Sequence, residues 1–264
     1  MKTPKQAGSS VTRKWAAPAV ALLTVGAVVL TGCSTEKKSD DTTAAQSAPP
    51  MSDSPRSGTA PSVDVTDANA LLEQAAKTTR LTTAVHLNMT VDKNFKGLPV
   101  NSLDGDVVTK PAPAAKGTGE FRLTDSFKEY EFVIIGGRLY TKEKGAASFT
   151  EAPSGQRTYD PSVVLSEDKG LANLLTKFHN PKVGETATHN GVKAVKVTGT
   201  LDSADFDSIF PTQGPGALKG EHPATAWIAY DSPNNLVEIS LNTKDGDITL
   251  TTSKWEEPVT ITKP

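Results

Sequence analysis

The chain has 264 residues, of which 36% are hydrophobic and 22% are charged, and its formal net charge is −2. This length allows one large domain or two small ones, and the near-neutral charge argues against a basic surface that binds nucleic acid. A single cysteine excludes an internal disulfide and a zinc cluster built from cysteines. A mean hydropathy of −0.33 excludes a polytopic membrane protein.

The N-terminal segment, residues 1–32, has the features of an export signal. Basic residues and no acidic ones precede an uncharged run at residues 15–30, which is short for a permanent transmembrane helix of about 20 apolar residues. The run ends at Leu30-Thr31-Gly32-Cys33, which resembles the lipobox of bacterial lipoproteins, where the cysteine is lipidated and becomes the first mature residue. Cleavage by an ordinary signal peptidase at a small-x-small site is the alternative. We expect lipidation, because the only cysteine directly follows the apolar run.

Residues 33–63 are expected to be a disordered tether that begins at the lipidated Cys33. Ser, Thr, Ala, Pro and Asp dominate this segment, and it has almost no large apolar side chain whose burial would offset the entropy of ordering the chain. A flexible coil of this length spans roughly 30 Å. Its composition is also compatible with a glycosylated stalk. Residues 64–264 are then expected to form a single domain.

The first half of this domain alternates between two hydrophobic periods. Helical spacing predicts a helix from about residue 68, with Asp64 or Thr66 as its N-cap. Alternation of apolar and polar residues then predicts antiparallel strands, and Gly136-Gly137 predicts a hairpin turn between the last two. These strands are expected at residues 85–91, 103–109, 116–123, 128–135 and 138–141.

The second half begins with helices. Asp160-Pro161 predicts a short helix, and a second helix over residues 171–178 is expected to end before Pro181. Asn190-Gly191 predicts a two-residue hairpin turn. A short helix is expected at residues 203–210, followed by a loop. The remaining strands are expected at residues 224–231, 236–242, 247–255 and 259–262.

This order of elements predicts an α+β fold. About ten strands and three or four helices are expected, and the helices are grouped rather than placed between successive strands, which disfavours a doubly wound parallel sheet. We expect one large, curved antiparallel sheet with helices on its concave face.

No pattern of catalytic or metal-binding residues stands out. The four histidines have no metal-ligand spacing and are interpreted as ordinary surface residues, and no serine lies in a G-x-S-x-G motif. The glycine-rich segment at residues 214–220 lacks the spacing of a phosphate-binding loop. The Asp-Gly-Asp segments at 104–106 and 245–247 lack the rest of a calcium loop. We therefore expect no enzyme, no cofactor and no bound metal.

One expected strand has glycines on an apolar face. Gly117 and Gly119 share this face with Phe121 and Leu123. A missing side chain leaves either room or close backbone contact, and a bend in a strongly curved sheet is the alternative. The two interpretations are compatible, since curvature helps to make a hollow.

Several segments, together with the lipobox, occur in the same order as in a known group of proteins; they are residues 103–107, 159–165, 170–175, 190–199, 223–228 and 253–259. From about residue 66 to the C-terminus, the chain resembles the LppX/LprG/LprF lipoproteins of mycobacteria and their relatives. Residues 198–202 and 247–250 are more similar to LprF and LprG than to LppX.

This resemblance implies a half-barrel sheet whose concave-side helices enclose an apolar cavity for acyl chains. It also implies a carrier of di- or triacylated glycolipids and lipoglycans from the inner membrane to the outer envelope, without catalytic residues. Phe121 falls on a family position that faces the cavity, and its bulk implies a narrower or differently shaped cavity. The residues expected to line the cavity are Leu87, Met89, Val91, Phe121, Leu123, Phe132, Ile134, Leu139, Val164, Leu171, Leu174, Leu175, Phe178, Trp227 and Ile239. An ordinary packed core is the alternative for each of them.

The expected location is the bacterial cell membrane, with the domain anchored through Cys33 and facing the periplasm or outer envelope. Besides the carrier, two other functions are considered. An interaction module, such as an accessory subunit of an envelope transporter or sensor kinase, would need an exposed apolar patch. A hydrolase of envelope lipids is disfavoured, since no catalytic constellation is evident.

Overall fold

The computed structural model describes residues 63–123, 126–152, 160–212, 214 and 217–264. The chain divides into two units, Met1–Pro55 and Arg56–Pro264, and all described residues belong to the second. The lipobox, Cys33 and nearly all of the expected tether therefore lie outside the described residues. None of the described helices combines the length and the hydropathy that a membrane crossing requires.

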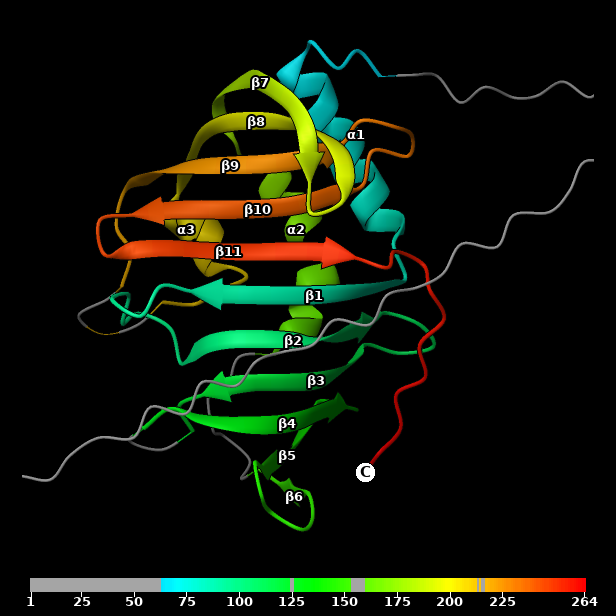
Figure 1. The fold of residues 1–264 in the computed structure, drawn as a ribbon, viewed down its shortest axis with the longest axis vertical. Helices are drawn as coiled ribbons and strands as arrows, with labels where there is room; N and C mark the ends of the chain where they lie inside the picture. The colour runs from blue at the N-terminus through cyan, green and yellow to red at the C-terminus, as the bar shows by residue number, and fades with distance from the viewer. Residues whose placement is uncertain (1–62, 124–125, 153–159, 213, 215–216) are drawn as a thin grey trace, which may run out of the picture. The chain divides into compact units, whose positions relative to one another are not determined.

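The described residues form one antiparallel sheet of 11 strands (Figure 1), in the spatial order β6-β5-β4-β3-β2-β1-β11-β10-β9-β8-β7. The last strand in the sequence, β11, lies beside the first, β1, and joins two blocks of consecutive antiparallel strands. The antiparallel sheet is thus as expected. The strands are β1 (Ala84–Val91), β2 (Val100–Val108), β3 (Ala114–Phe121), β4 (Lys128–Ile135), β5 (Arg138–Glu143), β6 (Thr150–Glu151), β7 (His179–His189), β8 (Val192–Asp202), β9 (Glu221–Ala229), β10 (Leu236–Thr243) and β11 (Gly246–Ser253).

The hairpin turns follow the sequence signals. Asn190 and Gly191 both have positive φ angles, of 50° and 80°, between β7 and β8. Gly136 and Gly137 have φ angles of 59° and 70° between β4 and β5. Two consecutive residues with positive φ are the backbone of the tight turn that suits the twist of paired strands.

The expected strand at residues 259–262 is wrong. This segment forms no strand, and Val259 and Ile261 instead pack against a small cluster of Ala84, Val108 and Ala114. Figure 1 shows the C-terminal tail running past the ends of β1, β2 and β3. The alternation in the tail therefore reflects apolar contacts with the sheet and not pairing within it.

The longest described helix is α1 (Ala68–Leu81), which begins one residue after its N-cap, Asp67. The Asp67 carboxylate accepts hydrogen bonds from the backbone N–H groups of Asn69 and Ala70. Neither Asp64 nor Thr66 is the cap, because Asp64 instead accepts from the backbone N–H of Thr66 within the preceding turn. The helix was expected, and its cap, Asp67, lies one residue beyond Thr66 and three beyond Asp64.

The other helices are short. They are the 3₁₀ helix η1 (Pro161–Leu165), α2 (Leu171–Leu175) and α3 (Ser203–Asp207). Helix α2 is shorter than the helical spacing predicts, because the chain leaves it after one turn and enters β7 at His179. Phe178 lies outside the helix, yet its side chain is still buried.

The helices α1, η1, α2 and α3 all contribute to one apolar cluster that also contains alternate residues of the strands. In β1, Val85, Leu87, Met89 and Val91 are buried members of this cluster. The helices thus pack against one face of the sheet, and α2 and α3 are visible behind β10 and β11 in Figure 1. We call this face, with its helices, the interior.

Candidate lipid-binding interior and outer groove

Two facing glycines bring β2 and β3 unusually close. Gly105 and Gly117 are directly paired across the two strands. A Cβ atom on Gly117 would lie 2.2 Å from the carbonyl oxygen of Asp104 and 2.6 Å from the Cα of Gly105. No side chain fits at such distances, so this pair provides close backbone contact and not room for a ligand.

The third glycine of this region has an aromatic ring beside it. A Cβ atom on Gly119 would lie 2.6 Å from the ring of Phe121, so that ring already occupies the space a side chain would take. Phe121 in turn meets Phe132 of β4 edge to face, with 5.5 Å between the ring centroids. The bulk of Phe121 therefore narrows the interior at this position.

The structure brings most of the predicted cavity residues together. Leu123 and Leu139 are partly buried and pack against the interior cluster. The buried members of the cluster from the predicted set are Leu87, Met89, Val91, Phe121, Phe132, Ile134, Val164, Leu171, Leu174, Leu175, Phe178 and Ile239.

Trp227 lies on the other face of the sheet. Its neighbours in β9, Ala226 and Ile228, belong to the interior, whereas Trp227 belongs to a second cluster with Ala194. The ring of His189 stacks on Trp227 with 4.3 Å between centroids. Because neighbouring residues of a strand point to opposite faces, Trp227 does not face the interior, and we leave it out of the candidate set.

The interior is closely packed where α1, η1 and α2 meet the sheet. A hollow there, bordered among others by Leu165, Leu171 and Leu236, has a volume of about 10 Å³. That is about the least volume that holds one water molecule, and it is far too small for an acyl chain. A lipid tail can enter at this position only if the side chains around it separate.

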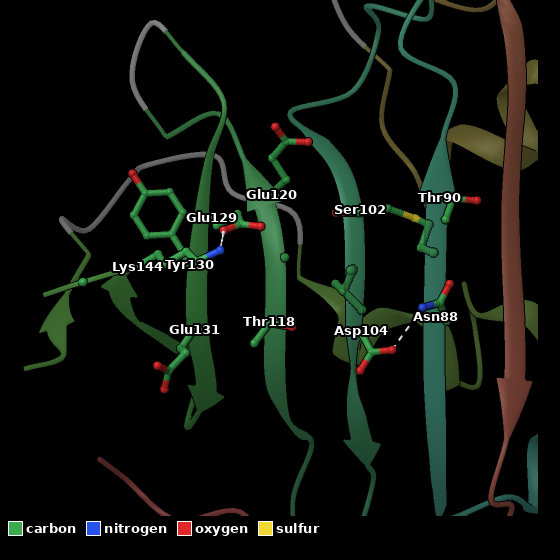
Figure 2. A pocket seen from close by; sticks show the side chains of 14 residues that line it. Asn88, Thr90, Ser102, Asp104, Thr118, Glu120, Glu129, Tyr130, Glu131 and Lys144 are labelled. Carbon is green, nitrogen blue, oxygen red and sulfur yellow. Dashed lines mark hydrogen bonds and ion pairs between the residues drawn. The ribbon is translucent and has the colours of Figure 1, made fainter. Parts of the chain in front are cut away.

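A larger hollow, of about 500 Å³, lies over the outer side of β1 to β4 (Figure 2). Asn88, Asp104, Thr118 and Glu131 form one row across these four strands, because each is paired with the next. Asn88 donates a hydrogen bond to Asp104 over 3.0 Å. Carboxylates and amides solvate hydrocarbon poorly, so we do not assign an acyl chain to this outer groove.

Three of the four histidines contact carboxylates. His86 lies between Asp106, 2.8 Å from its Nδ1, and Asp104, 3.6 Å from its Nε2. His189 lies 3.0 Å from Glu238. His179 donates to Glu221 over 2.6 Å, and this hydrogen bond raises the pKa of His179 above its ordinary value. His179, Glu221 and Asp202 form the one cluster of three His, Cys, Asp or Glu side chains among the described residues whose possible ligand atoms all lie within 4.8 Å of one another.

The fold is of the class with a single large antiparallel sheet and helices packed on one face of it. The family model described as LppX_LprAFG lipoprotein matches residues 67–261. The chain therefore belongs to this family, as the resemblance of its segments predicted.

Relatives of known name support this assignment. The chain is 36% identical over 203 residues to the lipoarabinomannan carrier protein LprG of Mycolicibacterium hassiacum, covering 76% of this chain and 86% of that protein. It is 30% identical over 259 residues to the putative diacylated glycolipid transporter LprF of Mycobacterium bovis, covering 93% and 91%. The crystal structure of LprF from M. bovis superposes with a TM-score of 0.66, covering 75% of this chain and 96% of that chain at 30% identity.

Proposed function

We propose that this protein is a lipid-anchored carrier that holds the acyl chains of a glycolipid or lipoglycan in its interior and moves them across the cell envelope. The observation that carries the proposal is the interior cluster itself. It is one continuous apolar layer between a single sheet and the helices packed on it, and it includes residues of α1, η1, α2 and α3. The names of the carrier LprG and the transporter LprF point in the same direction.

The physical need for such a carrier is clear. Exposing a 16-carbon acyl chain to water costs roughly 12 kcal/mol at about 0.8 kcal/mol per methylene, and a second chain doubles this cost. An acylated lipid therefore rarely leaves a membrane unaided. An apolar interior removes most of this cost, while the sugar headgroup remains in water. Such a role needs no catalytic group, cofactor or metal.

Loading requires the interior to open. The short helices η1 and α2 are the covers best suited to move, because each is five residues long and has few hydrogen bonds of its own. Separation of η1 from the sheet would expose inner residues of β2 and β3, and separation of Leu171 of α2 would expose those of β1, β10 and β11. A tail that enters replaces the contacts these side chains lose.

The proposal includes the anchor and the location. The signal peptide, residues 1–32, is removed, Cys33 carries the acyl groups, and residues 33–63 tether the single domain, residues 64–264, to the cell membrane. The domain then faces the periplasm or outer envelope. Two or more acyl chains hold a protein on a membrane stably, whereas one chain is marginal. An envelope transporter is the expected source of cargo.

Mass spectrometry of organic extracts tests the carrier function. The full-length Cys33→Ser form is purified from a mycobacterial host, so that acyl groups of the anchor do not contribute. We expect di- or triacylated lipid in near-stoichiometric amount in the extract. An extract without acylated lipid would sink the proposal.

The alternative of an interaction module has less support from the structure. It needs a contiguous exposed apolar patch. Among the described residues, Leu81 at the end of α1 is the exposed large hydrophobic side chain, 71% accessible, and one residue is not a patch.

A further inference from the structure

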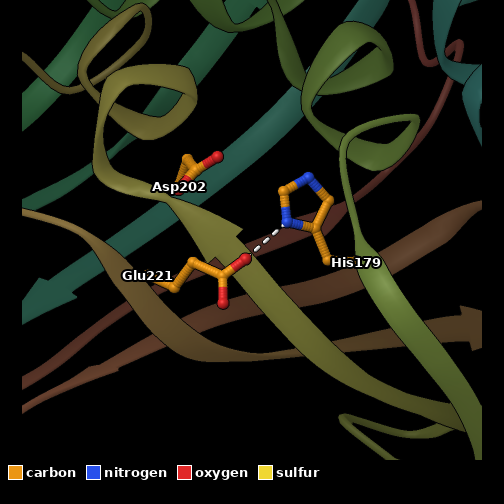
Figure 3. Close-up of side chains that lie close together, drawn as sticks. All are labelled: His179, Asp202 and Glu221. Atoms are coloured by element: carbon orange, nitrogen blue, oxygen red, sulfur yellow. Dashed lines mark hydrogen bonds and ion pairs between the residues drawn. The ribbon is translucent and has the colours of Figure 1, made fainter.

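Three adjacent strands bring a histidine and two carboxylates together at one end of the sheet. His179 is the first residue of β7, Asp202 the last of β8 and Glu221 the first of β9. Asp202 and Glu221 are directly paired, and His179 is paired with Thr200, two residues before Asp202. All three side chains therefore point to the same face. One ligand atom from each lies within 4.8 Å of the other two. Figure 3 shows the three side chains gathered at this end of the sheet.

The Asp202 carboxylate is available to a ligand. Asp202 is the N-cap of α3, but its side chain makes no capping hydrogen bond. Asp67 and Asp160, which hold the same position before α1 and η1, both cap with their carboxylates. The usual local partner of an N-cap aspartate is thus unused at Asp202, which instead lies beside His179 and Glu221.

The electrostatics of this cluster favour a cation. The carboxylates of Asp202 and Glu221 lie beside the one imidazole of His179, so negative charge remains in excess even when His179 is protonated. A divalent ion would neutralise this excess better than one proton does.

We propose that His179, Asp202 and Glu221 bind a divalent transition-metal ion of the Zn²⁺ class. One imidazole nitrogen and two carboxylate oxygens are a known ligand chemistry for such ions, with the remaining positions filled by water. Ca²⁺ and Mg²⁺ bind more weakly, because they prefer sites made of oxygen ligands alone. The proposal is independent of the lipid cargo. It replaces the expectation, from sequence, that His179 is an ordinary surface histidine.

The geometry needs only a small adjustment. Ligand atoms that are each about 2.1 Å from a tetrahedral zinc ion lie roughly 3.4 Å apart. His179 Nδ1 and Glu221 Oε1 are 2.6 Å apart without the ion, so they must separate by less than about 1 Å. Both side chains are about half exposed, at 43% and 52%, and are therefore free to rotate.

The site would brace the covers of the interior. The chain leaves the sheet after Asp202, forms α3, and returns at Glu221, where the backbone N–H of Ser203 donates to the carbonyl of Gly220 over 2.8 Å. His179 directly follows Phe178, which lies in the interior together with Phe206 of α3. A bound ion thus joins the start of β7, which follows α2, to the ends of β8 and β9, between which the chain forms α3.

The His86 cluster supplies a matched control. It also has one histidine and two carboxylates, but Asp106 contacts Nδ1 and Asp104 contacts Nε2. The carboxylates therefore lie at opposite sides of the ring. One ion coordinates only one ring nitrogen, so it cannot take all three ligands there.

Isothermal titration of full-length Cys33→Ser protein with zinc sulfate tests the site, since this form has no thiol to compete. We expect one zinc ion per chain, with affinity reduced about tenfold or more in His179→Gln and in Glu221→Gln. His86→Gln should bind as the parent does. Co²⁺ titration of the same proteins gives a second measurement, because absorption bands in the visible range report ligation directly.

Circular dichroism of each variant confirms that it is folded, and Asp202→Asn serves as a further variant of the same site. The absence of zinc binding by the parent, or equal affinity in His179→Gln, would overturn the proposal. So would the loss of binding in His86→Gln with His179→Gln unaffected.

Discussion

Phe121 of β3 and Phe132 of β4 meet edge to face at the interior, with 5.5 Å between their ring centroids and an interplanar angle of 83°. The two rings come from strands that are paired, and Phe121 also lies against Gly119 of its own strand. The ring of Phe121 therefore fills the space beside Gly119 of β3. This contact makes Phe121 the most direct place to alter the volume of the interior.

Replacing Phe121 by alanine should increase the lipid that the purified protein retains. Loss of the ring opens space beside Gly119 and Phe132, and an acyl chain can fill it. In lipid-free protein the same change should lower the free energy of unfolding by about 3–5 kcal/mol, the usual cost of removing a buried phenylalanine. Mass spectrometry of extracts and urea denaturation give the two measurements.

Val133→Ala is the control for this change, because Val133 is buried in β4 but alternates with Phe132 and points to the outer face. It should lower stability without changing the amount of retained lipid. Equal lipid content in Phe121→Ala and in the parent would contradict a lipid-binding role for this part of the interior.

Gly117→Ala should strongly destabilise the sheet. The new methyl group would lie 2.2 Å from a backbone oxygen, which a side-chain rotation cannot relieve. We expect a loss of more than about 2 kcal/mol in the free energy of unfolding. Gly184→Ala in β7 is the matched control, since its methyl group would approach no atom closer than 3.4 Å. If both variants unfold at the same urea concentration, the close contact of β2 and β3 is not as described.

Asp67→Ala should cost about 1 kcal/mol of stability, because it removes the side chain that caps α1. Asp64→Ala should cost less, since Asp64 caps only the preceding turn. Thermal unfolding of the two variants measures the difference. A larger effect at Asp64 would place the start of the helix where the sequence alone suggested it.

The ion pair of His179 and Glu221 should show a defined pH dependence. The pKa of His179 is raised in the folded protein, chiefly by its hydrogen bond to Glu221. The stabilising contribution is therefore fully present below the ordinary histidine pKa of 6.5 and is lost as the pH rises through the raised value. NMR titration of His179 in metal-free protein should give a pKa above 6.5, and Glu221→Gln should lower it. An unchanged titration in that variant would show that Glu221 is not the cause.

Cys33→Ser should release the protein from the membrane. The mature domain would then have no acyl anchor, and the substitution leaves residues 63–264 unaltered. Fractionation of the native host should find the variant in the soluble envelope fraction and the parent with the membranes. Membrane retention of the variant would show that another segment holds the protein there.

Much of the fold follows from local patterns. The predicted strand at residues 128–135 coincides with β4, and Asn190-Gly191 forms the predicted turn. These signals are strong because alternation and turn geometry depend on neighbouring residues alone. The strand predicted at residues 259–262 is wrong, because the alternation there arises from packing against strands that are far away in the sequence.

The candidate site was less predictable. Alternation shows that residues take opposite faces, but in β9 both faces are buried, so the apolar Trp227 gives no sign of which side it occupies. The cluster of His179, Asp202 and Glu221 could not be predicted from the sequence for another reason. Its members lie on three strands and are separated by 19 or more residues, so only the pairing of β7, β8 and β9 brings them together.

The seam between β1 and β11 has a consequence for how the molecule matures. One edge of β1 stays unpaired until the chain has been made as far as Ser253, because its partner on that edge is β11, the last strand in the sequence. The pairing of β1 with β11 therefore joins residues that are far apart in the sequence, and such contacts form slowly. Until β11 is available, the edge of β1 that later pairs with it exposes unpaired backbone N–H and C=O groups, to which another strand could add.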